Sequence, residues 1–224
     1  MSRAVGARTA LFCGEISTLS PMTPKNLAFA VLFFAFIACC GNDTITYGGQ
    51  TYKTVQIGEQ VWFAENLNYE AESSVCYENN PANCAKYGRL YNWETAMKVC
   101  PRGWHLPTDK EWDKLFRFVD GDTSTESPYK SETAGKHLKA VSGWSSGKEF
   151  DGNGTDKFGF SALPGGHCLP SNGFYDAVTN GFWWSARMEG IYHAYLRGMY
   201  YNNENAYWAD SPKSFLFSVR CVKD

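Results

Sequence analysis

The chain has 224 residues, of which 23 are acidic and 21 are basic, so its net charge is −2 with neutral histidines. This mildly acidic balance, with no run of Lys or Arg, argues against nucleic acid as a partner and provides no basic patch for a membrane surface. All 8 Trp and all 13 Tyr follow residue 39, where rings can fill a core or a binding face. The composition favours one globular domain in the later part of the chain.

The N-terminal part contains an export signal. Residues 27–38 are uncharged and apolar and follow Lys25. As a helix they would span about 18 Å, less than the roughly 30 Å of a bilayer core, which indicates a signal peptide and not a membrane span. Residues 1–21 are too long and polar to begin such a signal. We therefore expect them to be a mis-assigned upstream extension, with translation beginning at Met22 and a signal peptide over residues 22–38.

The end of this segment, Phe-Ile-Ala-Cys at residues 36–39, resembles the lipobox of bacterial lipoproteins, in which the Cys thiol receives a diacylglycerol. Cys39 fits because the small residue Ala38 precedes it, whereas Cys40 fits less well. The resemblance implies a lipid anchor at Cys39, and residues 39–50 are then expected to be a polar, Gly-rich tether. The alternative is an ordinary secretory signal that is cleaved after Ala38.

The first elements of the domain are a hairpin and a loop. Residues 51–58 alternate as in a strand, and residues 60–64 are expected to pair with them across a Gly-Glu turn. Residues 70–88 show no periodic pattern and are expected to form a loop. A short helix is predicted over residues 92–97, capped by Asn92.

The strongest helix signal begins at Thr108, which forms a capping box with Glu111. Four apolar residues then follow at helical spacing: Trp112, Leu115, Phe116 and Val119. A shorter helix is predicted over residues 132–141. After it, strands are predicted at residues 158–163, 182–186, 193–199 and 215–222. Strands, then helices, then strands describe an α+β domain.

Five cysteines follow Cys39 and Cys40, and cysteines of an exported chain are expected to form disulfides. Cys76 with Cys84 would close a local loop, and Cys100 with Cys221 would join the end of a helix to the last strand. Cys168 is then left as a partly buried free thiol.

Enzymatic motifs are sparse. The chain has no Cys-x₂-Cys or His-x₃₋₅-His pair, so a structural zinc ion is not expected. His167 and Cys168 are adjacent on an expected strand and point to opposite faces, so His167 is not expected to activate the thiol. We interpret His105 as a packed histidine in a loop between two prolines. A carboxylate pair, a Gly-rich phosphate loop and a Gly-x-Ser-x-Gly elbow are all missing from the sequence.

Three segments, taken in order, carry a family resemblance. They are residues 88–108, which include Gly-Arg-Leu-Tyr-Asn-Trp and Cys-Pro-Arg-Gly-Trp-His-Leu-Pro-Thr; residues 158–166, Phe-Gly-Phe-Ser-Ala-Leu-Pro-Gly-Gly; and residues 182–222, from Phe-Trp-Trp-Ser-Ala to Ser-Val-Arg-Cys-Val. Together they resemble the Fibrobacter succinogenes major paralogous domain, a family of secreted and lipid-anchored bacterial proteins, over roughly residues 51–224.

This family resembles the C-type lectin-like fold, which also contains the sulfatase-modifying oxidases. The resemblance implies two main helices with one small twisted antiparallel sheet and termini that lie together. It also implies a long bridge from the first helix to the last strand, which matches Cys100 and Cys221. It supplies no catalytic constellation to transfer.

No cofactor is expected, and calcium is the one alternative that the sequence offers. Residues 151–156 place oxygen ligands at alternate positions, as calcium loops do, although a Gly-Asn-Asp turn explains them equally well and residue 162 is Ala where an EF-hand has Glu. The calcium-binding motifs of sugar-binding lectins are missing. The candidate ligands are Asp151, Asn153, Thr155 and Asp156.

The best binding candidate is the segment of residues 199–208. Tyr and Asn dominate it, as they do in antibody loops, where rigid rings and adaptable amides recognise diverse ligands. The alternative is a strand pair with packed Tyr rings and an Asn-Asn turn. The candidate residues are Tyr200, Tyr201, Asn202, Asn203, Asn205, Tyr207 and Trp208, and Trp184 is a further candidate from another segment.

The sequence therefore predicts a lipid-anchored, surface-displayed binding or adhesion module without catalysis. Its expected partners are the bacterial membrane, through the anchor, and a polysaccharide or protein ligand. One alternative is an enzyme on a scaffold like that of the sulfatase-modifying oxidases, which need two reactive cysteines where this chain offers only Cys168. The other is a structural envelope protein.

Overall fold

The computed structural model describes residues 43–124, 128–171 and 173–224. The predicted export signal, the lipidation site Cys39 and the start of the tether lie outside these residues. Among the helices that the structure describes, none has the length and hydrophobicity that a membrane span requires. What the structure describes is one α+β domain.

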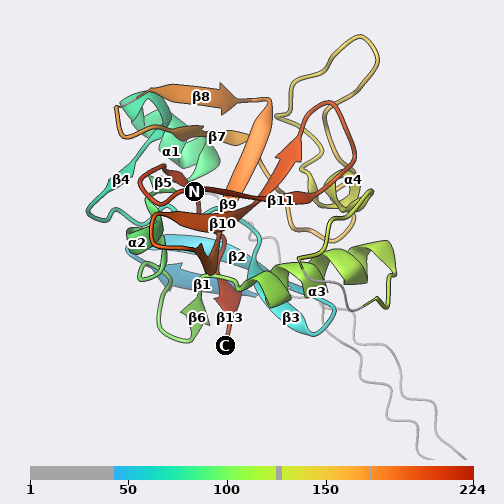
Figure 1. The fold of residues 1–224 in the computed structure, drawn as a ribbon, viewed down its shortest axis with the longest axis horizontal. Coiled ribbons are helices and arrows are strands. Elements are labelled where there is room, and N and C mark those ends of the chain that lie inside the picture. Colours follow the sequence, from blue (N-terminus) through green and yellow to red (C-terminus); the bar gives the residue numbers. More distant parts are fainter. Residues whose placement is uncertain (1–42, 125–127, 172) are drawn as a thin grey trace, which may run out of the picture. The chain divides into compact units, whose positions relative to one another are not determined.

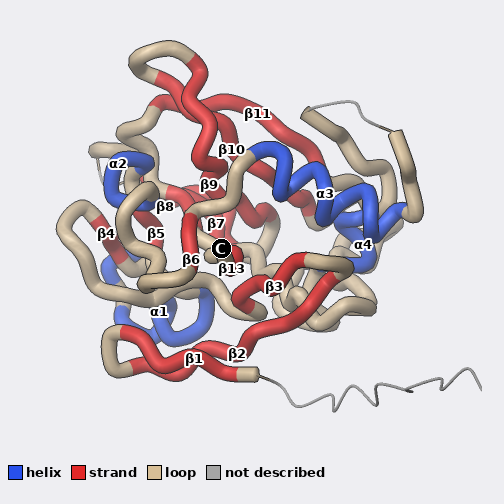
Figure 2. The backbone as a smooth tube through the Cα atoms, turned by 90° about the horizontal axis from the view of Figure 1, so that it is seen from below, coloured by secondary structure: helices blue, strands red, loops and turns tan. Residues whose placement is uncertain are grey.

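The first sheet has five antiparallel strands and joins the two ends of the domain (Figure 2). Its strands, in spatial order, are β1 (Thr44–Tyr47), β2 (Gln50–Ile57), β3 (Gln60–Phe63), β13 (Val222–Lys223) and β6 (Trp104–His105). The predicted hairpin is confirmed as β2 and β3. The predicted tether is wrong in its second half, because β1 pairs with β2 from Thr44 onward and so belongs to the sheet.

The second sheet is larger. Its main strands, in spatial order, are β11 (Tyr207–Pro212), β10 (His193–Tyr200), β9 (Asn180–Glu189), β12 (Phe217–Ser218), β5 (Leu90–Tyr91) and β4 (Ser74–Val75). Off this path, β7 (Gly165–Cys168) pairs with β9, and β8 (Phe174–Ala177) pairs with β7. The predicted strands at residues 182–186 and 193–199 are confirmed within β9 and β10. The strand predicted over residues 215–222 is divided between β12 and β13, which lie in different sheets.

The predicted strand over residues 158–163 is wrong. Ser161 has a φ of 51°, which breaks the extended run, and Ala162 makes only an isolated bridge with Lys139. The buried guanidinium of Arg220 donates hydrogen bonds to the carbonyl oxygens of Phe160 and Ser161, where strand partners would otherwise lie.

One helix, α3 (Asp109–Asp120), is long, and it confirms the strongest helix prediction. Thr108 and Glu111 form the capping box, and the helix ends at Gly121, whose φ of 70° is left-handed. The other helices are short: the 3₁₀ helix η1 (Tyr77–Asn79), α1 (Pro81–Tyr87), α2 (Trp93–Ala96) and α4 (Ala134–Leu138). Short helices were predicted at the places of α2 and α4, whereas α1 lies where a loop was predicted.

The α+β class is therefore confirmed, but the expected arrangement of two main helices on one small sheet is not what the structure shows. Two curled sheets lie at the sides of a single main helix (Figure 1). The reason is that the C-terminal segment does not remain in one sheet: β12 joins β9 and β5, and β13 then continues between β3 and β6.

Both expected disulfides are present, between Cys76 and Cys84 and between Cys100 and Cys221. Cys168 is free, as predicted, but it is completely buried and not partly buried. Its bridge to Leu216 places it under the segment that leads into β12, which shields the thiol from solvent.

Candidate functional site

The Tyr- and Asn-rich segment of residues 199–208 forms the hairpin of β10 and β11. Gly198 pairs with Tyr207, and the rings of Tyr200 and Tyr207 stack with centroids 4.7 Å apart. The segment thus has the strand-pair structure that was the alternative to a binding loop. Because β11 is the outer strand of its sheet (Figure 1), the hairpin still presents side chains at an edge of the domain.

The position of the Tyr207 ring depends on Gly198. A Cβ atom at Gly198 would lie 2.4 Å from Cζ of Tyr207, so only glycine lets the ring lie across β10. The Tyr207 hydroxyl is buried and forms no hydrogen bond of normal geometry with the described residues. Burial, with the Tyr200 hydroxyl nearby, raises the pKa of Tyr207 well above its usual 10, so the group stays a neutral phenol.

A hollow of about 420 Å³ opens beside this ring pair. Its lining residues are Lys130, Tyr200, Asn203, Asn205, Tyr207 and Trp208. Five of the six are residues that the sequence predicted for ligand binding, and the structure brings them together. Trp208 is 38% exposed, so a ligand can reach its ring. The ring also contacts that of Tyr195, which holds it in place.

Lys130 was missed by the sequence prediction. It reaches the hollow because Ser131 and Ala206 exchange two backbone hydrogen bonds of 2.9 Å, which hold this segment along the start of β11. This pairing joins segments that are distant in the chain, so no local pattern indicated it.

Lys139 stabilises the turn between the two strands from the protein interior. Its side chain is 2% exposed, and its ammonium donates hydrogen bonds to the carbonyl oxygens of Tyr200 (3.1 Å) and Asn203 (2.9 Å). Burial lowers the pKa of Lys139 to about 8. The backbone N–H of Asn205 donates to Oδ1 of Asn203 at 3.0 Å, so the turn is fixed before any ligand arrives.

Three other predicted residues are not part of the hollow. Trp184 is completely buried and donates from Nε1 to the carbonyl oxygen of Tyr91, so its prediction as a ligand-binding residue is wrong. The cause is that β9 is an interior strand covered on both faces. Tyr201 packs against the core near Gly152, and neither Tyr201 nor Asn202 lines the hollow.

The calcium candidates are engaged in hydrogen bonds of the fold. Asp151 accepts from the backbone N–H and the side-chain amide of Asn153, which lowers the pKa of its carboxyl group. Asp156 accepts from the backbone N–H and hydroxyl of Ser161, and Thr155 donates to the carbonyl oxygen of Lys136. Within the described ranges, no three His, Cys, Asp or Glu side chains are grouped as metal ligands.

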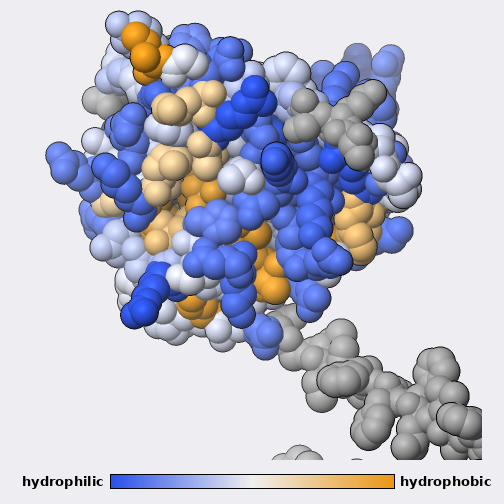
Figure 3. Space-filling model, turned by 60° about the horizontal axis from the view of Figure 1, so that its bottom comes forward, coloured by the Kyte–Doolittle hydropathy of each residue, from blue (hydrophilic) through white to orange (hydrophobic). Residues whose placement is uncertain are grey.

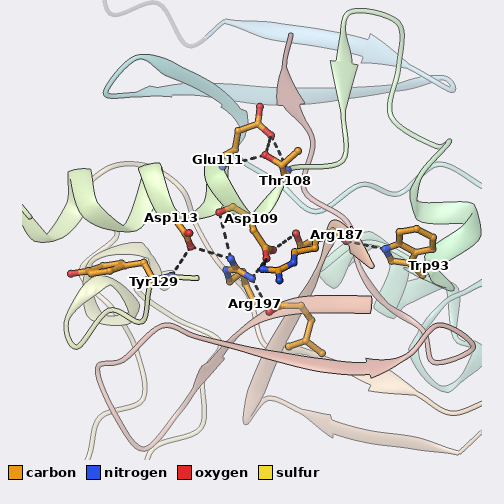
Figure 4. A network of polar contacts seen from close by, with 10 residues as sticks. Trp93, Thr108, Asp109, Glu111, Asp113, Tyr129, Arg187 and Arg197 are labelled. Carbon is orange, nitrogen blue, oxygen red and sulfur yellow. Dashed lines mark hydrogen bonds and ion pairs between the residues drawn. The ribbon is translucent and has the colours of Figure 1, made fainter. Parts of the chain in front are cut away.

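Behind the hairpin, a buried ionic network fixes β10 on α3. Figure 4 shows the Arg197 side chain between Asp109 and Asp113. Its guanidinium lies 3.0 Å from Oδ1 of Asp109 and 3.1 Å from Oδ1 of Asp113. Ser185 donates a 2.5 Å hydrogen bond to Asp109, and Arg187 binds its other oxygen. Because Arg197 is completely buried, the network is structural and holds β10 in a fixed position on α3.

The fold and the hollow together define a class: disulfide-bonded α+β domains that carry an aromatic and amide hollow at the edge of a curled sheet. Within that class, residues 55–223 match the Fibrobacter succinogenes major domain, and the chain belongs to this family. No curated protein matches the chain, and no solved structure matches it.

Proposed function

We propose that this protein is exported, anchored to a bacterial membrane through a lipid on Cys39, and displayed at the cell surface as a binding or adhesion module without catalysis. The observation that carries the proposal is the hollow at the β10–β11 hairpin, with stacked Tyr rings, an accessible Trp208 and side-chain amides. Rigid rings provide contact area at a small cost in entropy, and amides adapt their hydrogen bonds to the ligand.

The ligand is a polysaccharide or a protein surface, and the chemistry of the hollow favours a polysaccharide. Sugar rings present C–H faces that stack on aromatic side chains, and their hydroxyls can pair with the side-chain amides of Asn203 and Asn205. On the face seen in Figure 3, hydrophobic residues occur in separate groups between hydrophilic ones.

The absence of catalysis is also part of the proposal. Among the described cysteines, Cys168 alone is outside a disulfide, and burial raises the pKa of its thiol. A protonated, buried thiol is a poor nucleophile. This argues against an oxidase like the sulfatase-modifying enzymes, which need two reactive cysteines in one groove.

A C-type lectin-like fold is the finer proposal for the architecture. It is supported by the disulfide from Cys100, ahead of α3, to Cys221 before the last strand, and by the shared sheet of β1 and β13. An experimental structure that fails to superpose on C-type lectin domains over α3 and both sheets would contradict it.

The binding proposal is tested by retention on insoluble polysaccharides such as cellulose, xylan and peptidoglycan, with an array of envelope proteins in parallel. On the retaining ligand, Tyr207→Ala and Trp208→Ala should each weaken binding about ten-fold, equivalent to about 1.4 kcal/mol, because each removes one ring of the hollow. The matched control is Tyr192→Ala, which removes a ring that is 75% exposed and outside the hollow. Equal loss in all three variants, or retention on neither ligand class, would refute the proposal.

Anchoring is tested separately. Metabolic labelling with a fatty-acid analogue should mark the wild-type chain and not Cys39→Ala, and protease added to whole cells should digest the labelled domain. A label that persists in Cys39→Ala would contradict the anchor without affecting the binding assay.

A further inference from the structure

A second hollow, of about 480 Å³, lies between β2 and α1. Four segments line it: parts of residues 50–55, 64–68, 84–88 and 159–163. None of these residues lines the hollow at the β10–β11 hairpin, so the two spaces have separate walls. We call this second hollow the β2–α1 groove.

The walls of the groove are fixed by buried contacts. Asn66 donates a 2.8 Å hydrogen bond to the carbonyl oxygen of Tyr87 on α1, and its Oδ1 accepts from Trp183 and Arg220. Gly88 has a φ of 76°, and a Cβ atom there would lie 2.8 Å from the carbonyl oxygen of Leu67. The Cys76–Cys84 disulfide holds the same helix. The groove is therefore formed before a ligand binds, which lowers the entropic cost of binding.

The free polar groups of the groove are mainly donors. Lys53 lines it from β2 and Lys86 from α1, and neither ammonium takes part in any ion pair of the described residues. The ammonium of Lys86 lies 4.6 Å from the centre of the Tyr87 ring, a contact that leaves its charge available to an anion. The side-chain amide of Asn68 likewise has no hydrogen bond within the described chain, although its backbone groups bind Gln50 and Tyr52.

The acceptors and hydroxyls of the groove are largely engaged in the fold. The hydroxyl of Thr54 donates to the carbonyl oxygen of Asp43, and that of Ser161 donates to Asp156. One oxygen of Glu65 accepts from the backbone N–H of Lys53 at 3.0 Å, which leaves the other oxygen for a ligand hydroxyl. The groove thus offers two ammonium groups, the amide of Asn68 and one oxygen of the Glu65 carboxylate, and its two lysines outweigh the single negative charge of Glu65.

We propose that the β2–α1 groove is a second binding site, for a saccharide that carries an anionic group. Lys53 and Lys86 bind the anionic group from the two walls, because unpaired ammonium groups recognise carboxylate or phosphate as point charges. Asn68 and the free oxygen of Glu65 pair with the sugar hydroxyls. The volume lies within the range of small-molecule sites, and the lining combines polar and apolar surface, as a saccharide requires.

The test is calorimetric titration of the full-length protein in detergent with trigalacturonate, glucose 6-phosphate and maltotriose. Trigalacturonate and glucose 6-phosphate supply the anionic group as a carboxylate or a phosphate, and maltotriose supplies none. At least one anionic probe should bind, more weakly as salt is raised, and maltotriose should bind more weakly than that probe. The anionic probe that binds more tightly shows whether the groove prefers a carboxylate or a phosphate.

The decisive variant is Lys53→Ala with Lys86→Ala. Two exposed ion pairs of about 0.7 kcal/mol each give an expected loss of about ten-fold in affinity for the anionic probe. The matched control, Lys98→Ala with Lys110→Ala, removes two exposed lysines outside the groove and should leave the affinity unchanged. Ala85→Trp is a second variant, because Ala85 is exposed and lines the groove, where an indole should block binding without disturbing the core.

The outcomes for the two sites are separable. Trp208→Ala should leave the affinity for the anionic probe unchanged, and the Lys53 and Lys86 double variant should leave retention at the hairpin hollow unchanged. The groove proposal is overturned if neither anionic probe binds, if maltotriose binds as tightly, or if the lysine pair and its control lose affinity equally.

Discussion

The two disulfides close loops of very different length, which allows a quantitative prediction of their contributions to stability. The sequence separations are 121 for Cys100–Cys221 and 8 for Cys76–Cys84. The chain-entropy relation then gives about 4.9 kcal/mol for the long loop and about 2.5 kcal/mol for the short one. Replacing the long pair with alanine should therefore lower the free energy of unfolding by about 2.4 kcal/mol more than replacing the short pair.

The assay is urea unfolding of the two double variants and the wild type, with the slope fitted separately for each protein because removing a cross-link lets the unfolded chain expand. Packing acts in the same direction as chain entropy, because Cys221 is completely buried in the core, whereas Cys84 retains 6% exposure. Equal losses for the two pairs, or a larger loss for the short pair, would refute the loop-length argument. Because disulfide bonds form and persist in oxidising compartments, both bonds also fit the proposed export of the chain.

Four further outcomes follow from single residues. Gly198→Ala should displace the Tyr207 ring and weaken binding at the hairpin hollow, with circular dichroism unchanged; full affinity would contradict the role of the glycine. Lys139→Met removes both donors to the turn and should speed amide exchange at Asn205, measured by mass spectrometry. Burial lowers the pKa of His105, but its hydrogen bonds to Asp224 and Glu111 raise it above 6.5. The stability that His105→Gln removes should therefore be largest below pH 6.5 and vanish once the pH exceeds the raised pKa. Finally, the Cys168 thiol should resist a maleimide until urea unfolds the domain.

Local signals predicted the elements that local interactions build. The capping box of Thr108 and Glu111 predicted α3, because both of its hydrogen bonds lie within one turn. The hairpin of β2 and β3 was equally local. The helix α1 also had local signals, with Asn80 as its cap, Pro81 in its first turn and Gly88 at its end. It was missed because seven residues are too few to show an apolar period.

Elements that depend on distant partners were not predictable in this way. Residues 158–163 have the composition of a strand, yet Arg220, 60 residues after Phe160 in the chain, donates to the Phe160 carbonyl and is itself completely buried. A guanidinium in that position takes the place of a neighbouring strand. The division of the last predicted strand between two sheets likewise depends on β9 and β3, far apart in the sequence.

The hairpin shows how the two alternatives for residues 199–208 fit together. A strand pair with packed rings does not exclude a binding site, because the sheet order decides which rings reach solvent. Trp184 lies on β9, inside the sheet, and is completely buried, whereas Trp208 lies on the outer strand β11 and is 38% exposed. Both sit in aromatic strand sequences that look alike. The composition of a segment can therefore indicate binding chemistry, but only the order of strands, set by distant pairings, assigns that chemistry to particular rings.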